Sequence, residues 1–300
     1  SWEWHKFVLS DPDRGLDILR QDSHGCLALH LAAHFGHAAV VRVLCREGAP
    51  VNTRNHKGET ALHWASRNGH RTVIELLLKH RADVMAQDLE GWSSLDWSII
   101  GRNTQLVKML LDCCDTLDLP QNGMNRALIL AAEAGNEATV RMLLKKEIDV
   151  NWRDHAGSTS LAWAVPQGHT EVVHILLDNG ADANSKDYYG NTSLYWSLPY
   201  LEIASLLIAR GAEVDAMNDK SETALLWSAQ DGQERVLQIL IDSGANVLVQ
   251  DNYGCTALHA AASRGHESII NILLQNGSDP TKEIKTNGHL CTARSSTQPA

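Results

Sequence analysis

The sequence lacks the features that mark several functional classes. No apolar run approaches the roughly 18 to 20 residues needed to span a bilayer, and no signal peptide is visible. The phosphate-binding patterns GxxxxGKS/T and GxGxxG, the nucleophile pattern GxSxG and the zinc pattern HExxH are also absent. We therefore expect neither a membrane partner nor an enzyme activity, and we expect no cofactor and no bound metal ion.

Basic residues are scarce in the second half of the chain. Residues 1–150 contain 17 Lys/Arg against 19 Asp/Glu, whereas residues 151–300 contain 9 against 17. Binding to a phosphate backbone needs clustered Lys and Arg. We therefore expect no nucleic-acid partner.

The cysteines form no CxxC pair, and their spacing is not that of a disulfide framework. We interpret all of them as free thiols in a reducing compartment, which predicts a cytoplasmic location, with the nucleus as the alternative. They are Cys26, Cys45, Cys113, Cys114, Cys255 and Cys291.

A turn position recurs along most of the chain at steps of 33 residues, with one step of 31. A leucine follows it four residues later in every case, and a threonine that can cap a helix follows two residues later in five. Because neither of the two short helices in each period can bury its apolar face alone, the pattern predicts an all-α solenoid of stacked helix-turn-helix units. The turn residues are Gly25, Gly58, Gly91, Met124, Gly157, Gly190, Ser221 and Gly254.

These residues resemble the ankyrin-repeat family, whose pattern is D-x-x-G-x-T-P-L-H-x-A-A-x-x-G-H. The pattern is nearly complete in residues 55–70 and 251–266, and it is recognisable in residues 22–37 and 154–169. The resemblance implies β-turn fingers, each followed by two antiparallel helices. It also implies that the array binds other proteins on a concave face formed by the fingertips and the first helices.

We expect eight repeats over residues 22–283. Residues 1–21 are then a partial repeat or cap, and residues 284–300 a partial repeat or a disordered tail. The ragged ends and the first residue, Ser1, suggest a domain from a longer protein. The expected repeats are 22–54, 55–87, 88–120, 121–153, 154–186, 187–217, 218–250 and 251–283.

The pattern is interrupted around residues 113–126. Met124 stands at the turn position and Arg126 at the capping position. The glycine that ends the second helix elsewhere is replaced in three consecutive repeats, by Arg81, Cys114 and Glu147. We interpret this segment as a locally irregular joint, and a bend or loop shaped for a partner is the alternative.

A second interruption lies in the repeat of 31 residues at 187–217. Pro199 cannot continue a helix interior, so we expect a short first helix there. Pro166 interrupts the repeat before it. The two neighbouring repeats are therefore expected to share an unusual rim.

Seven of the 15 histidines recur at fixed repeat positions, and we interpret them as hydrogen-bonding struts between turns. His24, His34 and His56 fall at predicted surface positions, without the spacing of metal ligands. The seven recurring histidines are His30, His37, His63, His70, His169, His259 and His266.

Five of the nine tryptophans share one position, two residues after the recurring leucine. We interpret them as core residues that pack between successive repeats, with a binding site as the alternative. Trp163→Ala is then expected to cost about 3–5 kcal/mol of stability. The five are Trp64, Trp97, Trp163, Trp196 and Trp227.

The remaining variable positions are the fingertips and the exposed ends of the first helices. Binding energy concentrates in Trp, Tyr and Arg anchors. For each aromatic residue the alternative is packing on a neighbouring finger. We expect the partner-binding residues to be Trp92, Tyr188, Tyr189, Tyr200, Tyr253, His56, Lys57, Arg67, Leu89 and Phe35.

The sequence thus predicts a monomeric, non-enzymatic protein–protein interaction module that binds a protein or peptide. The expected face is basic to neutral at its N-terminal end and acidic at its C-terminal end, which favours a partner with the complementary charge gradient. One alternative is a sensor or autoinhibitory array of a larger multidomain signalling protein, which holds another domain of the same chain. Another is an accessory domain that presents substrates to an enzyme.

Overall fold

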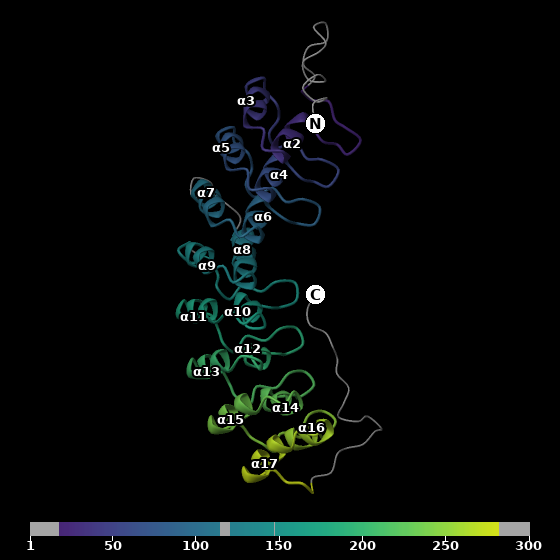
Figure 1. Ribbon diagram of the computed structural model, residues 1–300, viewed down its shortest axis with the longest axis vertical. Coiled ribbons are helices and arrows are strands. Elements are labelled where there is room, and N and C mark those ends of the chain that lie inside the picture. The colour runs from purple at the N-terminus through teal and green to yellow at the C-terminus, as the bar shows by residue number, and fades with distance from the viewer. Residues whose placement is uncertain (1–17, 115–120, 147, 282–300) are drawn as a thin grey trace. The chain divides into compact units, whose positions relative to one another are not determined.

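The computed structural model describes residues 18–114, 121–146 and 148–281, and within these residues it contains 16 α-helices and no β-strand (Figure 1). The predicted all-α class is therefore confirmed. The first helices of successive repeats are α2 (Ala28–His34), α4 (Ala61–Arg67), α6 (Ser94–Ile100), α8 (Gln121–Glu133), α10 (Ser160–Ala164), α12 (Ser193–Trp196), α14 (Ala224–Gln230) and α16 (Ala257–Arg264). The second helices are α3 (Ala38–Arg46), α5 (Arg71–Lys79), α7 (Thr104–Cys114), α9 (Glu137–Leu144), α11 (Thr170–Asp178), α13 (Leu201–Ala209), α15 (Glu234–Asp242) and α17 (Glu267–Gln275).

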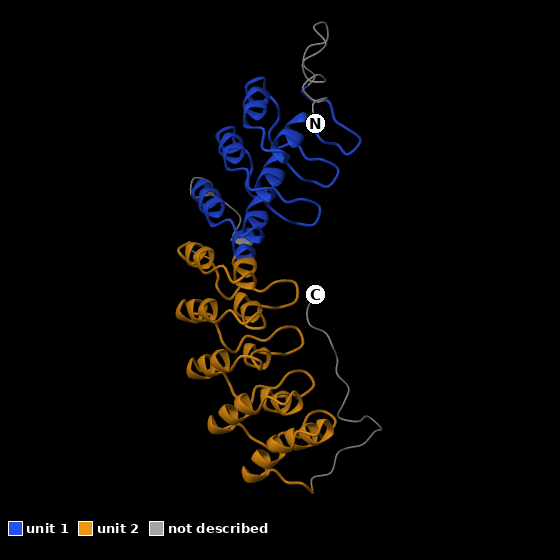
Figure 2. Ribbon diagram, in the orientation of Figure 1, with its two compact units in different colours: residues 1–127 blue, residues 128–300 orange. Residues whose placement is uncertain are grey.

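The chain divides into two compact units, residues 1–127 and 128–300 (Figure 2). In the first unit α2, α4 and α6 pack in one row, and α3 packs on α5 in another. In the second unit one row runs from α10 through α12 and α14 to α16, and the other runs from α9 through α11, α13 and α15 to α17. Helices of neighbouring repeats thus cover one another, as the predicted stacking requires.

The recurring leucine is the centre of each repeat's core. Leu62 and Leu161 are completely buried, and Leu225 is 1% exposed. The second helices contribute Ile74 and Leu176, which are also completely buried. Each short helix is therefore held mainly by apolar contacts with its neighbours rather than by its own length.

Each finger is closed by an Asp or Asn side chain that lies three residues before the turn position. In the finger of residues 187–191, Asp187 Oδ1 accepts hydrogen bonds from the backbone N–H groups of Tyr189 and Asn191, both at 2.9 Å. Asn55 makes the same two bonds in its finger, with Lys57 and Glu59, also at 2.9 Å. Asp and Asn are therefore interchangeable at this position.

Successive fingers are joined by backbone hydrogen bonds. In the first unit His56 N–H donates to His24 O and Leu89 N–H donates to Lys57 O, both at 2.9 Å. In the second unit the corresponding bonds are Tyr188 N–H to Ala156 O, Asp219 N–H to Tyr189 O and Asn252 N–H to Lys220 O, at 3.0–3.2 Å. Each unit therefore has its own ladder of fingers.

The recurring histidines are structural within the described residues. His63 Nδ1 accepts from Thr60 N–H at 3.0 Å, and His63 Nε2 donates to Trp92 O in the next finger at 3.0 Å. Burial lowers the pKa of His63, which keeps the ring neutral as these two bonds require. After the exit glycine, His70, His169 and His266 donate to a carbonyl of the preceding repeat, as His70 Nε2 does to His34 O at 2.9 Å, whereas His37 in the first repeat is exposed.

The fourth repeat has a helix where the other repeats have a finger. Met124 and Arg126, which align with the turn and the cap of the other repeats, both lie inside α8, which begins at Gln121. A helix replaces the finger because the glycine that favours a turn and the threonine that caps a helix are both missing, and helical hydrogen bonds satisfy the backbone instead. The remainder of the expected irregular joint, residues 115–120, lies outside the described residues.

Glycine is replaced at other turn positions without loss of the left-handed backbone. Arg81 has φ 63° at the end of a second helix, and Ser221 has φ 59° at a finger turn. Arg102 has φ 52° at the position that Gly36 and Gly69 occupy in the first two repeats. The sequence pattern identified the first two substitutions but not Arg102.

The short first helix predicted before Pro199 is present, because α12 has only four residues. Cys26, Cys45 and Cys113 are free thiols, as expected. Cys255 is disulfide-bonded, so the expectation of free thiols is wrong for this residue. The predicted terminal segments, residues 1–21 and 284–300, lie almost entirely outside the described residues.

Candidate functional site

In each unit the fingers project from the row of first helices on the side away from the second helices (Figure 1). We call the surface formed by the fingers and the outward side of the first helices the finger-side face. Each unit has a finger-side face of its own.

The five recurring tryptophans lie on the finger-side face and not in the core. None of Trp64, Trp97, Trp163, Trp196 and Trp227 is buried; each is partly exposed. The expectation that they are fully buried core residues is therefore wrong, but packing between successive repeats is present, since Trp64 meets His34 and Trp227 meets Tyr195 edge to face.

The physical reason is the geometry of the helix. Each residue turns an α-helix by about 100°, so two residues correspond to about 200°. A side chain two positions after the buried leucine therefore points to nearly the opposite side of the helix. Leu161 is completely buried, and Trp163 on the same helix faces the fingers.

Carboxylates of the fingers orient three of these indoles. Trp163 Nε1 donates to Asp154 Oδ2 at 2.7 Å, and Trp227 Nε1 donates to Glu222 Oε2 at 3.3 Å. Trp64 Nε1 donates to Glu59 Oε2 at 2.8 Å. Burial raises the pKa of Glu59, but hydrogen bonds from Asn55 and Trp64 outweigh it, so the pKa lies below its usual value.

In the first unit, side chains of the chain itself cover the tryptophans. The Arg67 guanidinium lies 4.1 Å from the ring centroid of Trp97 and 3.7 Å from Glu59 Oε1. His34 meets Trp64 edge to face, with ring centroids 5.0 Å apart. Each covering residue belongs to the repeat before the tryptophan that it covers.

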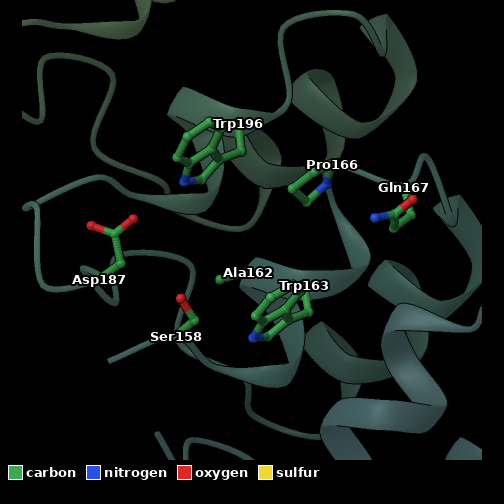
Figure 3. Close-up of a pocket in the computed structure, with 7 residues that line it drawn as sticks. All are labelled: Ser158, Ala162, Trp163, Pro166, Gln167, Asp187 and Trp196. Carbon is green, nitrogen blue, oxygen red and sulfur yellow. The ribbon is translucent and has the colours of Figure 1, made fainter. Parts of the chain in front are cut away.

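In the second unit two tryptophans border an open pocket of about 150 Å³ (Figure 3). The indoles of Trp163 and Trp196 lie on opposite sides of Ala162, with Asp187 and Ser158 toward one end and Pro166 and Gln167 toward the other (Figure 3). The walls are therefore aromatic, and one end carries a carboxylate.

Most of the predicted partner-binding residues are exposed. In the first unit Phe35 is 60% exposed and Leu89 is 78% exposed. His56 and Lys57, at the tip of the finger of residues 55–59, are exposed as well. In the second unit the exposed residues are Tyr188, Tyr189 and Tyr253, at 65%, 62% and 47%.

Two of these rings also support the neighbouring finger. His56 lies against Gly25, and Tyr188 lies against Gly157. A Cβ atom at either glycine would lie 2.6 Å from the ring. Glycine is therefore required at both turns for this close approach as well as for its positive φ.

Three of the predicted partner-binding residues, Trp92, Arg67 and Tyr200, contact other side chains or backbone atoms of the same chain. Arg126 stacks on Trp92 at 4.4 Å, and Arg67 stacks on Trp97. The Tyr200 hydroxyl donates to Pro166 O in the preceding repeat at 3.3 Å. In other repeats a histidine makes the equivalent bond, as His169 Nε2 does to Glu133 O. Tyr200 therefore takes the structural place of such a histidine.

The sequence analysis missed Trp163, Trp196 and Asp187 as surface residues, whereas Ser158 and Gln167 fall at variable positions of a fingertip and a first-helix end. For the tryptophans, the sequence did contain a signal of surface exposure. Their distance of two residues from a leucine that must be buried already places them outside the core. Pro166 and Pro199 predicted an unusual rim between these two repeats, but the sequence did not reveal a pocket there, because a pocket depends on how the side chains of the two repeats meet.

The described residues provide no group of three or more His, Cys, Asp or Glu side chains able to hold a metal ion. Among the helices of these same residues, none is both long enough and apolar enough to cross a bilayer.

Comparison with known proteins agrees with this architecture. The family model "Ankyrin repeats (3 copies)" matches five overlapping segments of the chain: residues 6–88, 29–119, 95–187, 153–218 and 196–284. No catalytic domain is identified alongside these repeats. No curated protein matches the chain with significant similarity.

Proposed function

Because the chain belongs to the ankyrin-repeat family, whose members are generally protein–protein interaction modules, we propose that it is a non-enzymatic module that binds a protein or peptide on the finger-side face of its second unit. The observation that carries the proposal is a pair of exposed tyrosines, Tyr188 and Tyr189, at the tip of the finger whose Asp187 lines the pocket.

The exposed tyrosines are costly without a partner-related role. Tyr188 and Tyr189 leave 65% and 62% of their surfaces in water, although large aromatic rings favour burial. Tyrosine and tryptophan are also the residues in which binding energy concentrates. Trp163 and Trp196, partly exposed in the pocket, extend the same aromatic surface onto the first helices.

The charge of the second half favours a polypeptide partner of opposite sign. Residues 151–300 have 17 acidic against 9 basic side chains. Such a surface repels nucleic acid and attracts basic segments. A standard interface of about 1,600 Å² would involve several fingers and first helices of this unit.

The test is affinity capture with the wild-type chain beside the double variant Tyr188→Ala/Tyr189→Ala. Removal of two anchor side chains, each worth about 2 kcal/mol or more, should abolish retention of specific partners. Because one face of Tyr188 rests on Gly157, the melting temperature of the variant is measured in parallel.

The matched control is Leu274→Ala on α17, a second helix of the same unit. Leu274 is 42% exposed, so its truncation also removes exposed apolar surface, but away from the fingers. We expect this control to retain the partners. If the tyrosine variant folds and retains every partner, the proposal is contradicted.

A further inference from the structure

We propose that the pocket between Trp163 and Trp196 receives an arginine side chain of the partner polypeptide, with the guanidinium stacked on Trp196 and paired with Asp187. This inference rests on the proposed function, because it specifies the chemistry that the same face recognises.

In the first unit an arginine of the chain itself stacks on the equivalent tryptophan. There the Arg67 guanidinium lies 4.1 Å from the centroid of Trp97 and 3.7 Å from a carboxylate oxygen of Glu59. Its carboxylate partner comes from its own repeat, at the position that Ser158 occupies beside the pocket, whereas Asp187 comes from the next repeat. Arginine combines a planar cation that stacks on an indole with donors that bind a carboxylate. Stacking on this repeated tryptophan is therefore geometrically compatible with the fold.

Alignment of the repeats places the pocket where that arginine would lie. Arg67 comes five residues after the buried Leu62, and Pro166 comes five residues after the buried Leu161. In each case the next repeat supplies a tryptophan at the same position, Trp97 or Trp196. Proline is too short to cover the indole, so the space that Arg67 fills in the first unit is open in the second.

The polar groups at the pocket fit a cation better than a neutral or acidic group. Asp187 Oδ2 accepts one hydrogen bond, from Asn191 Nδ2 at 3.1 Å, and a carboxylate oxygen can accept a second. The other lining residues contribute no basic side chain. An aromatic or aliphatic occupant would cover Asp187 without pairing its charge, which is costly.

The size of the pocket fits one side chain. A cavity of about 150 Å³ can hold a molecule as large as benzene, and a guanidinium is planar and smaller. The remaining volume accommodates part of the methylene stem against Pro166. The rest of the partner would then run along the finger-side face, near Tyr188 and Tyr189.

The experiment is an NMR titration of the full chain with the capped peptide acetyl-Gly-Gly-Arg-Gly-Gly-amide. The indole N–H signals are assigned with Trp196→Phe and Trp163→Phe. We expect saturable shifts of these two signals at a dissociation constant on the order of 1 mM, as befits a single subsite. Peptides with citrulline or glutamate in place of arginine should cause no saturable shift.

The informative variant is Asp187→Asn, which removes the charge and keeps the finger closed, because Asn55 and Asn218 make the same backbone bonds in their fingers. It should weaken binding of the arginine peptide at least about fivefold. Its matched control is Asp251→Asn, which removes one charge at the same position of the last finger and should leave binding unchanged.

Three results would overturn the inference. One is the absence of any shift with the arginine peptide, and another is equal binding of the citrulline peptide. The third is a lysine peptide that binds as tightly as arginine, which would show that planar stacking is not recognised. If the peptide fails while Tyr188→Ala/Tyr189→Ala still loses its captured partners, the proposed function stands and only the arginine subsite is rejected.

Discussion

At the scale of single residues, Asp96 stands where histidine stands in three other repeats. It makes the same local bonds, since its Oδ2 accepts from the N–H and the hydroxyl of Ser93, both at 2.8 Å. Its Oδ1 atom is buried and has no hydrogen-bond partner in the described part of the chain. Burial raises the pKa of Asp96, and the bonds from Ser93 offset this only in part.

Asp96→Asn should therefore stabilise the protein at neutral pH. A carboxyl whose pKa is raised on folding adds stability below the pKa of the unfolded chain, and this contribution is lost as pH rises through the folded pKa. At pH 7 the raised pKa of Asp96 therefore costs stability, and the neutral amide of the variant avoids this cost. We expect a gain on the order of 1 kcal/mol at pH 7 that vanishes below about pH 4, measured by urea unfolding across this range.

The control for this prediction is Asp22→Asn at the first finger. Backbone N–H donors, chiefly that of Cys26, lower the pKa of Asp22, so its contribution has the opposite sign and is lost as pH falls. This variant should gain nothing at pH 7. A destabilised Asp96→Asn protein at pH 7 would contradict our account of the buried carboxyl.

The tryptophans show what the residue pattern can and cannot reveal. Recurrence every 33 residues shows that a side chain has an equivalent environment in each repeat, but it does not say whether that environment is core or surface. The separation of two residues from the buried leucine does indicate a surface position, because the tryptophan side chain then points away from the leucine side chain. The error about Trp163 arose because the interpretation used the 33-residue period of the repeats and neglected the period of about 3.6 residues within the helix.

At the scale of elements, α8 is the main departure from the repeated plan. Residues that align with a finger form the first turns of a 13-residue helix, and Met124 is 8% exposed within it. The sequence indicated an irregular segment, because both the turn glycine and the capping threonine are missing there. It did not indicate a helix, because alignment with the other repeats implied a turn.

Two substitutions at Met124 distinguish the helix from a turn. Both Met124→Ala and Met124→Gly remove the buried side chain, so their difference isolates the backbone. In a helix interior glycine is less favourable than alanine by about 1 kcal/mol, whereas at a finger turn with positive φ glycine would be the better residue. We expect the alanine variant to be the more stable of the two by urea unfolding.

The reverse order of these two variants would contradict the helical assignment of residues 121–133. A control pair at a true finger turn is Ser221→Gly and Ser221→Ala, where the φ of 59° favours glycine. The opposite ranking at the two sites would show that the fourth repeat differs from the others in its backbone and not only in its sequence.

At the scale of the whole molecule, much of the architecture follows from the sequence, and the position of the binding surface follows only in part. The turn, cap and leucine positions predict the repeats because each has a local physical cause. The exposure of Tyr188 and Tyr189 is predictable because both lie at a variable fingertip, although Tyr188 also packs on Gly157 as His56 packs on Gly25. The role of Tyr200 is not predictable, because its structural bond to Pro166 O replaces that of a histidine and is visible only in three dimensions.

The sequence indicated an unusual rim at Pro166 but not the pocket itself. The pocket exists because Pro166 leaves uncovered an indole that a longer side chain covers in the first unit. Such a vacancy is a property of two adjacent repeats together. Alignment of the repeats therefore becomes informative only once the direction of each side chain is known.

The central claim is that Trp163 and Trp196 serve a partner and not the core. The most direct test measures the affinity of a captured partner for Trp163→Ala, with the free energy of unfolding determined on the same samples. Our account predicts binding at least about 30-fold weaker, with a loss of stability below about 2 kcal/mol. Unchanged affinity, or a stability loss of about 3–5 kcal/mol as for a core aromatic residue, would contradict it.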